Sequence, residues 1–163
     1  MPKTIPYVSN LDDNVREKAI EMLNSALSDS IDLCLAIKQA HWTMKGPSFI
    51  GLHELMDAVV DRMREHMDMI AERCIILGGH THGTLEQVSA NKEIDPYPAD
   101  ITWQGDHVDA LTQRMIAFGG KLRQFINQSD EAGDVDTSDL FTEISRSVDK
   151  DAWFIGAHSV DRD

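Results

Sequence analysis

The chain has 163 residues, of which 42% are apolar, so it is long enough for one domain with a hydrophobic core. Its formal net charge of −13 argues against a general nucleic-acid-binding surface. No stretch approaches the roughly 18 uninterrupted apolar residues of a membrane span, and the N-terminus lacks the pattern of a signal peptide. We therefore expect a cytoplasmic protein, with association with the nucleoid left open, that has a short tail at residues 1–10 and a single domain over residues 11–163.

A first long helix is predicted from Leu11 to about Met44. Asn10 is the expected N-cap, and Asp12 and Asp13 would lie in the first turn, where the helix dipole favours negative charge. The predicted inner face repeats at steps of three and four residues and consists of Ile20, Leu23, Leu27, Ile31, Cys34 and Ile37. Such a length favours an antiparallel hairpin of two helices, joined through a corner at Lys45-Gly46-Pro47.

A second helix is predicted from Ser48 to Leu77, with Gly78 and Gly79 as its stop signal. Its apolar residues form one stripe, made of Leu52, Met56, Val59, Met63, Met67, Ile70, Cys74 and Leu77. Cys34 and Cys74 both lie at apolar helix positions and lack CxxC spacing, which predicts reduced cysteines in the core rather than a disulfide.

A neighbouring stripe of the second helix carries side chains that can bind a metal ion. His53 and Asp57 are four residues apart, a spacing that lets two side chains on one helix reach a common ion. The same spacing relates Asp68 to Glu72. Asp57 and Asp68, however, are about 16 Å apart along the helix axis, which one ion cannot span. Either each pair acts alone, or a second copy of the helix, antiparallel across a two-fold axis, completes the site.

His41, at the end of the first helix, would add another nitrogen to such a site. Imidazole and carboxylate ligands without a thiolate suit iron(II), manganese or zinc better than copper(I). The plain alternative is a solvated acidic helix face, which is the commoner reading of any single pair of this kind. Spacing alone leaves the metal site and the solvated face equally open.

The helical pattern fades from His80 to Gly105, which predicts a long crossover rather than a short turn. Three histidines of this region are interpreted as loop and helix-start residues rather than as a second metal site, namely His80, His82 and His107. A third helix is predicted from Asp106 to Gln128, and Gly119 and Gly120 inside it suggest close helix approach. Its inward residues are Leu111, Met115, Phe118, Leu122, Phe125 and Ile126.

Acidic residues crowd the segment before the last predicted helix, at Asp130, Glu131, Asp134, Asp136 and Asp139. Acids belong in the loop before a helix and in its first turn, which accounts for part of this cluster. The last helix carries its apolar residues on one side, at Leu140, Ile144, Val148, Ala152 and Ile155. Four long helices make the expected fold class all-α.

These residues together resemble the signature of the Dps family, the mini-ferritins of the ferritin-like superfamily. The resemblance rests on Lys38-Gln39-Ala40-His41-Trp42, Gly46, Phe49, His53, Asp57, Asp68, Glu72, Arg73 and Leu77-Gly78-Gly79. The segment from Asp136 to Phe154 also resembles the family's last helix. The resemblance implies a ferritin-like four-helix bundle, with a long crossover that carries a short helix between helices two and three.

The resemblance also implies a ferroxidase that oxidises Fe²⁺, preferably with hydrogen peroxide, and stores ferric mineral in a hollow homododecamer, protecting DNA from oxidative damage. It selects the shared site, with His41, His53 and Asp57 from one subunit and Asp68 and Glu72 from its two-fold neighbour. Zinc or manganese could occupy the same ligands. Trp42 would lie close to the iron, and acidic pores that attract cations would be lined by Asp130, Asp134, Asp136 and Asp139.

Direct binding of DNA is not expected, despite the family's name. Family members that bind DNA commonly use a lysine-rich tail, whereas residues 1–10 contain only Lys3 and the chain ends in Asp161-Arg162-Asp163. Two alternative functions remain: a nucleoid-compacting protein, which would need a basic tail, and a helical bundle that holds zinc or manganese without redox chemistry.

Overall fold

The structure is a computed structural model, and it describes residues 4–159. Over this range the chain forms four long helices and one short helix, which are α1 (Asp13–Thr43), α2 (Phe49–Ile76), α3 (Leu85–Asn91), α4 (Gln104–Glu131) and α5 (Val135–Gly156). Lys3 and residues 161–163, on which the expectations about the tails depend, lie outside it. None of the helices in the described range is long and apolar enough to cross a membrane.

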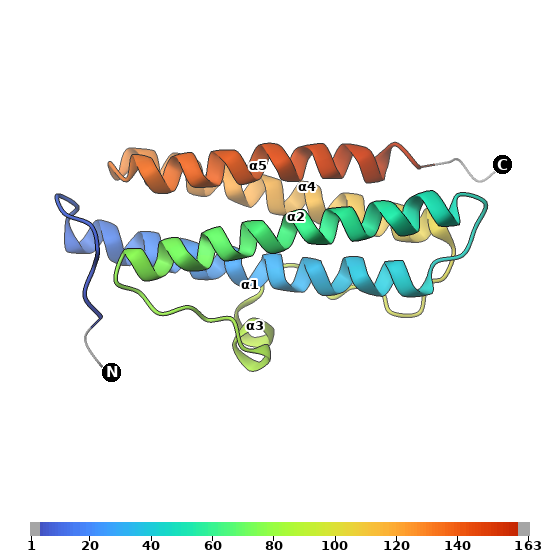
Figure 1. Cartoon of the computed structure of the whole chain (residues 1–163), viewed down its shortest axis with the longest axis horizontal. Coiled ribbons are helices and arrows are strands. Elements are labelled where there is room, and N and C mark those ends of the chain that lie inside the picture. Colours follow the sequence, from blue (N-terminus) through green and yellow to red (C-terminus); the bar gives the residue numbers. More distant parts are fainter. Residues whose placement is uncertain (1–3, 160–163) are drawn as a thin grey trace.

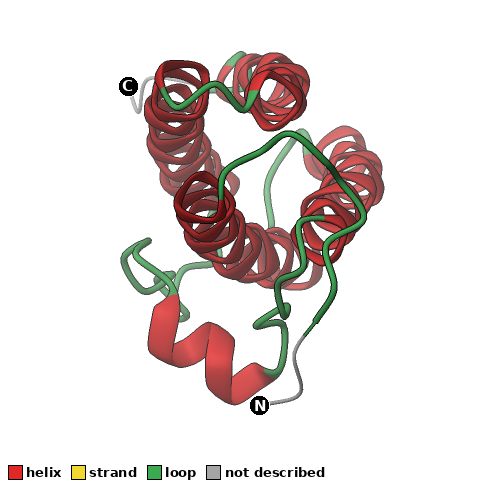
Figure 2. Ribbon diagram, turned by 90° about the vertical axis from the view of Figure 1, so that its left-hand side faces the viewer, coloured by secondary structure: helices red, strands yellow, loops and turns green. Residues whose placement is uncertain are grey.

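The long helices pack as two hairpins, α1 with α2 and α4 with α5, which lie side by side (Figure 1). Seen along the bundle, the short helix α3 lies outside the four long helices and packs against α1 (Figure 2). The long segment between α2 and α4 carries α3 and connects the hairpins. The prediction of an all-α four-helix bundle with a helix-bearing crossover is confirmed.

The apolar stripes predicted from the sequence form the core. Residues at the centre of each stripe are fully buried, among them Leu23, Ile37, Leu52, Met63, Leu111 and Ile144. Residues at the stripe edges are only partly buried, namely Ile20, Ile31, Met67, Phe125, Ile126 and Leu140. Cys34 and Cys74 are buried and unpaired, as predicted. Burial raises the pKa of the Cys34 thiol to about 11, so it stays protonated at neutral pH.

The first helix begins later than predicted. Asn10 has a φ of +59°, in the left-handed region that asparagine tolerates, so it turns the chain instead of capping the helix. Asp12 has the extended backbone of an N-cap, and α1 begins at Asp13. The preceding segment is held against the end of α2, because the backbone N–H of Tyr7 donates to the carbonyl of Ile76 at 2.8 Å.

The expectations for the third helix and the loop after it also need correction. Helix α4 spans Gln104–Glu131 rather than ending at Gln128, so Asp130 and Glu131 belong to the helix. Only residues 132–134 connect it to α5, and Gly133 makes the turn with a φ of +83°. The acidic segment is therefore mostly helical, and only a tight turn separates α4 from α5.

Of the two glycines inside α4, one supports close packing. A Cβ atom at Gly119 would lie 2.9 Å from a carboxylate oxygen of Asp149 on α5, so the glycine permits this approach. At Gly120 a Cβ atom would meet nothing within 4 Å, so the prediction of close approach is wrong there.

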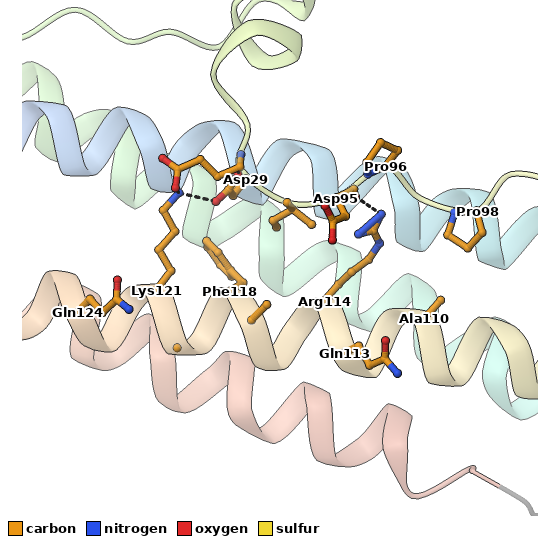
Figure 3. A pocket seen from close by; sticks show the side chains of 14 residues that line it. Asp29, Asp95, Pro96, Pro98, Ala110, Gln113, Arg114, Phe118, Lys121 and Gln124 are labelled. Atoms are coloured by element: carbon orange, nitrogen blue, oxygen red, sulfur yellow. Dashed lines mark hydrogen bonds and ion pairs between the residues drawn. The ribbon is translucent and has the colours of Figure 1, made fainter.

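Hydrogen bonds and ion pairs fasten the crossover to the bundle. The carboxylate of Asp29, which is fully buried, accepts from Lys121 at 2.7 Å and from the backbone N–H of Glu93 at 2.8 Å (Figure 3). Lys92 pairs with Asp32 at 2.7 Å. Beside them Arg114 donates to the carbonyl of Asp95, across a depression of about 590 Å³ between the crossover and α4. None of the predicted metal ligands lines this depression.

Candidate metal centre

The corner between α1 and α2 sets the register of the two helices at the candidate site. Lys45 and Trp103 form a bridge, in which the N–H of Lys45 donates to the carbonyl of Thr102 at 2.7 Å. The side-chain oxygen of Gln104 accepts from the N–H of Ser48 at 2.8 Å. A Cβ atom at Gly46 would lie 2.3 Å from that same oxygen, so a larger residue here would displace the Gln104 side chain that holds the corner.

Directly beyond this corner, His41 and His53 bond reciprocally. The Nδ1 atom of each ring lies 2.9 Å from the backbone carbonyl oxygen of the other residue, and the rings stack with centroids 3.6 Å apart. Because a carbonyl oxygen only accepts, each Nδ1 must carry the proton, which leaves the lone pair of each Nε2 available. Metal-binding histidines commonly hold their other ring nitrogen in this way.

Asp57 lies one turn of α2 beyond His53 and faces the same pair of rings. Its carboxylate is 3.4 Å from Nδ1 of His41 and 2.7 Å from the ammonium of Lys38 on α1. The hydrogen bond from Lys38 lowers the pKa of Asp57, and the nearby imidazoles add to this effect. The residue is exposed, so the carboxylate is an ionised group open to solvent rather than a buried acid.

Aromatic side chains surround this cluster without closing it. Phe49 packs at 5.0 Å from the ring of His53. Trp42 is 66% exposed, and the ammonium of Lys38 lies 5.5 Å from the centre of its ring. Within one chain the indole of Trp42 therefore lies open to solvent at the edge of the cluster.

Asp68 and Glu72 do not join this cluster. Both lie exposed on the C-terminal half of α2, and neither makes a hydrogen bond or ion pair with any residue in the described range. The structure thus brings together His41, His53 and Asp57 and leaves the other two predicted ligands apart. Across residues 4–159, no group of three or more histidine, cysteine or acidic side chains is arranged to hold a metal ion within one chain.

The acidic cluster near the start of α5 divides into two kinds of residue. Asp134 is 3% exposed, and it caps α5 by accepting from the N–H of Thr137 at 3.1 Å. Its carboxylate also accepts from Arg73 of α2 at 2.8 Å, so its charge is compensated. The exposed acids are Asp130, Glu131, Asp136 and Asp139. Only these have side chains open to water.

Several residues with clear structural roles were not identified from the sequence. Lys38 and Arg73 belong to the family signature, but nothing in their spacing indicates their carboxylate partners, Asp57 and Asp134. His107, interpreted as a helix-start residue, is fully buried and hydrogen-bonded to Tyr97 at 2.6 Å. His80 and His82 are exposed on the crossover, as expected of loop residues.

Comparisons with known proteins agree with this architecture. A family model for the ferritin-like domain matches residues 20–161. A DNA protection during starvation protein of Agrobacterium fabrum is 44% identical over 156 residues, which cover 96% of each chain. The Dps of Mycobacterium smegmatis superposes with a TM-score of 0.88 at 30% identity, covering 95% of this chain and 93% of that one. For DpsC from Streptomyces coelicolor the TM-score is 0.92 at 26% identity, over 99% and 94% of the two chains. The chain therefore belongs to the Dps family of ferritin-like proteins.

Proposed function

We propose that this protein is an iron-storing ferroxidase whose metal site is built from two chains. The family supports iron storage and the protection of DNA in general terms. The finer proposal rests on one observation: His41 and His53 hold their Nε2 lone pairs free beside Asp57, while the other two candidate ligands are exposed and unpaired. One chain thus carries two separated parts of a ligand set.

A two-fold axis can unite these parts. If α2 of a second chain runs antiparallel to α2 of the first, its Asp68 and Glu72 come opposite His53 and Asp57, which closes the gap of about 16 Å along one helix. The exposed Trp42 would be covered by the same contact. Further copies would assemble into a hollow homododecamer, in which ferric mineral is stored.

The ligand set suits oxidation of Fe²⁺, which is the substrate. Imidazole and carboxylate ligands bind Fe²⁺ and leave coordination positions open to an oxidant. Hydrogen peroxide is the preferred oxidant in this proposal, because its reduction takes two electrons and two Fe²⁺ ions supply one each. Peroxide is then reduced without release of hydroxyl radical, so storage and detoxification are the same reaction. Zinc or manganese would compete for the same ligands.

Anaerobic loading with Fe²⁺ followed by titration with peroxide tests this activity. We expect two Fe³⁺ ions per peroxide, with little hydroxyl radical in a spin-trapping assay. His53→Ala should abolish the fast oxidation, whereas His82→Ala, an exposed crossover histidine, should leave it unchanged. Oxidation no faster than in protein-free buffer would instead favour a bundle that only holds zinc or manganese.

The exposed acids near the start of α5 would speed the entry of iron. We propose that Asp130, Asp136 and Asp139 line a negatively charged pore, whose field raises the local concentration of cations. Changing all three to Asn should slow oxidation at low Fe²⁺ and have little effect at saturating Fe²⁺, in stopped-flow measurements. Glu86→Gln on α3 is the control. Equal rates in the triple variant at every Fe²⁺ concentration would contradict the pore.

Protection of DNA would come from removing iron and peroxide rather than from binding DNA. A chain with a net charge of −13 repels phosphate and releases few counterions on contact. We expect no retention of duplex DNA in a gel-shift assay at physiological salt without divalent ions. Retention that weakens steeply with added salt would show direct binding and favour nucleoid compaction.

A further inference from the structure

A row of hydrogen bonds connects the crossover to the helix that carries His41. The phenol of Tyr97, on the crossover, lies 2.6 Å from Nδ1 of His107, and Nε2 of that ring lies 3.3 Å from the hydroxyl of Thr43. Thr43 in turn donates to the carbonyl of Gln39 at 2.7 Å. Thr43 follows His41 by two residues on α1, so the two residues are about 3 Å apart along the helix axis, with their side chains on opposite faces of the helix.

The protonation states in this row are set by burial. Burial raises the pKa of Tyr97, with a smaller opposing effect from the charge of Arg114, so the phenol stays protonated. Burial also lowers the pKa of His107, so its imidazole is neutral at pH 7. The phenol is then the donor and Nδ1 the acceptor, while Nε2–H donates to Thr43.

The surroundings favour loss of an electron from the phenol only together with its proton. The guanidinium of Arg114 lies 5.2 Å from the centre of the Tyr97 ring, which penalises a positively charged ring. Nδ1 of His107 is already within hydrogen-bond reach to take the phenolic proton. The nearby backbone of Ile101 and the charge of Asp106 both favour the imidazolium that results.

We propose that Tyr97 and His107 form a proton-coupled electron donor that consumes the oxidising equivalent left when only one Fe²⁺ is bound. This inference rests on the proposed ferroxidase function. A single Fe²⁺ reduces peroxide by one electron and gives Fe³⁺, hydroxide and a hydroxyl radical. The radical takes one electron from Tyr97 and becomes hydroxide. The phenolic O–H bond breaks, its proton moves to Nδ1 of His107, and a phenoxyl radical remains beside an imidazolium.

A second Fe²⁺ restores the pair. It gives one electron to the phenoxyl radical and becomes Fe³⁺, while the proton returns from His107 to the phenolic oxygen. The sum of the two steps is two Fe²⁺ and one peroxide converted to two Fe³⁺ and two hydroxide ions. This is the same balance as at a fully loaded site, so the pair allows the two electrons to arrive one at a time without release of hydroxyl radical.

The chain offers a matched control, because it contains two tyrosines, Tyr97 and Tyr7, and Tyr7 is 78% exposed. Protein labelled with ring-deuterated tyrosine is loaded anaerobically with less than one Fe²⁺ per site, mixed with peroxide and freeze-quenched for electron paramagnetic resonance. We expect a tyrosyl signal in the wild type and in Tyr7→Phe, and its loss in Tyr97→Phe. Added Fe²⁺ should remove the signal, and Tyr97→Phe should release more spin-trapped hydroxyl radical.

His107→Asn separates electron donation from a structural role, because loss of the proton acceptor should lower the tyrosyl yield while α-helical circular dichroism is unchanged. Fe³⁺ is measured in the same samples. Normal Fe³⁺ formation without a tyrosyl signal in wild type, or with the same signal in Tyr97→Phe, would overturn the proposal while the ferroxidase function stands.

An experiment without iron distinguishes failure of the electron-donor proposal from failure of the proposed ferroxidase function. Azide radicals made by pulse radiolysis remove one electron from exposed aromatic residues, and in Tyr7→Phe the oxidation should move to Tyr97 as phenoxyl absorption. Absence of phenoxyl absorption in Tyr7→Phe would overturn the assignment of Tyr97 as an electron donor. If phenoxyl forms normally in this experiment but Fe²⁺ and peroxide give no Fe³⁺, the ferroxidase function is overturned. The oxidant proposed for Tyr97 and His107 then falls with it, whereas their capacity to donate an electron stands.

Discussion

The two halves of α2 treat their candidate ligands in opposite ways. In the N-terminal half, His53 is bonded to α1 through both its ring and its carbonyl, and Asp57 is paired with Lys38. In the C-terminal half, Asp68 and Glu72 are exposed and make no contact of this kind with residues 4–159. One half presents ligands whose orientation is already set, while the other presents ligands that need a second surface.

The C-terminal half is nevertheless well anchored, through its opposite face. Arg73, next to Glu72, points to α5, where it donates to Asp134 at 2.8 Å and to the hydroxyl of Thr137 at 3.0 Å. Stability and the proposed metal binding would therefore depend on different side chains at this end of α2. At the N-terminal end, the same histidines would serve both purposes.

The largest expected effect tests whether the two halves belong to one site. A variant with His41, His53 and Asp57 changed to Ala should lose nearly all peroxide-dependent oxidation, as should a variant with Asp68 and Glu72 changed to Ala. If both are unfolded together and reassembled in equal amounts, about half of the two-fold pairs are mixed, and each mixed pair rebuilds one site of its two. About a quarter of the wild-type activity should return.

Each variant unfolded and reassembled alone is the control, and it should recover nothing. Ligands drawn from a single chain could not be restored by mixing, because neither chain would hold a complete set. Mixed assemblies of wild-type size, measured by light scattering, that regain no oxidation would rule out the shared site.

The anchoring of the C-terminal half gives the next largest effect. Asp134→Ala removes the cap of α5 and leaves the partly buried guanidinium of Arg73 without its main partner, which should cost about 3 kcal/mol of unfolding free energy. Asp136→Ala should change stability by less than about 0.5 kcal/mol, because its side chain is 84% exposed and 3.9 Å from Arg73. Urea denaturation of both variants is the measurement. Similar losses of unfolding free energy in the two variants would contradict the distinction between the buried Asp134 and the exposed Asp136.

Single substitutions of candidate ligands in the two halves of α2 should differ in unfolding free energy by a smaller amount. His53→Ala removes one of the reciprocal bonds and exposes the stacked ring of His41, at a cost of about 1–2 kcal/mol. Asp68→Ala and Glu72→Ala should stay within about 0.5 kcal/mol of wild type in iron-free protein. Thermal unfolding of these variants is the measurement. If Asp68→Ala or Glu72→Ala destabilised the protein as much as His53→Ala, the histidines would not have the special structural role assigned to them.

His66, midway along α2, gives the smallest expected effect, which depends on pH. It is 8% exposed, and neither ring nitrogen has a hydrogen-bond partner in the described range. Burial lowers its pKa below 6.5, against the charges of Asp151, Glu65 and Glu143. The unfolded chain therefore binds a proton first as the pH falls, so stability is complete above pH 6.5 and decreases below it.

Replacing His66 by Leu should flatten this dependence between about pH 6.5 and 5, in unfolding experiments at a series of pH values. His82→Leu, on the exposed crossover, is the control and should keep the wild-type slope. A wild-type slope in His66→Leu would assign the pH dependence to other groups.

Local patterns were sufficient for much of the fold. The spacing of Leu52, Met56 and Val59 defines the buried face of α2, because a helix repeats every 3.6 residues wherever it packs. The start of α1 was predicted less well. Asn10 and Asp12 are both good capping residues, and the choice between them depends on how the preceding segment lies against Ile76.

Sequence alone determined the residue types and helical spacing of the candidate ligands, because these depend only on side-chain chemistry and on the rise of a helix. Only the tertiary structure decided what each side chain does. It placed Asp134 in a buried pair, turned Gly120 to open space and joined Tyr97 to His107. Arg73 and Asp134 are 61 residues apart, and Tyr97 lies on the crossover outside any helix, so no helical period could reveal these contacts.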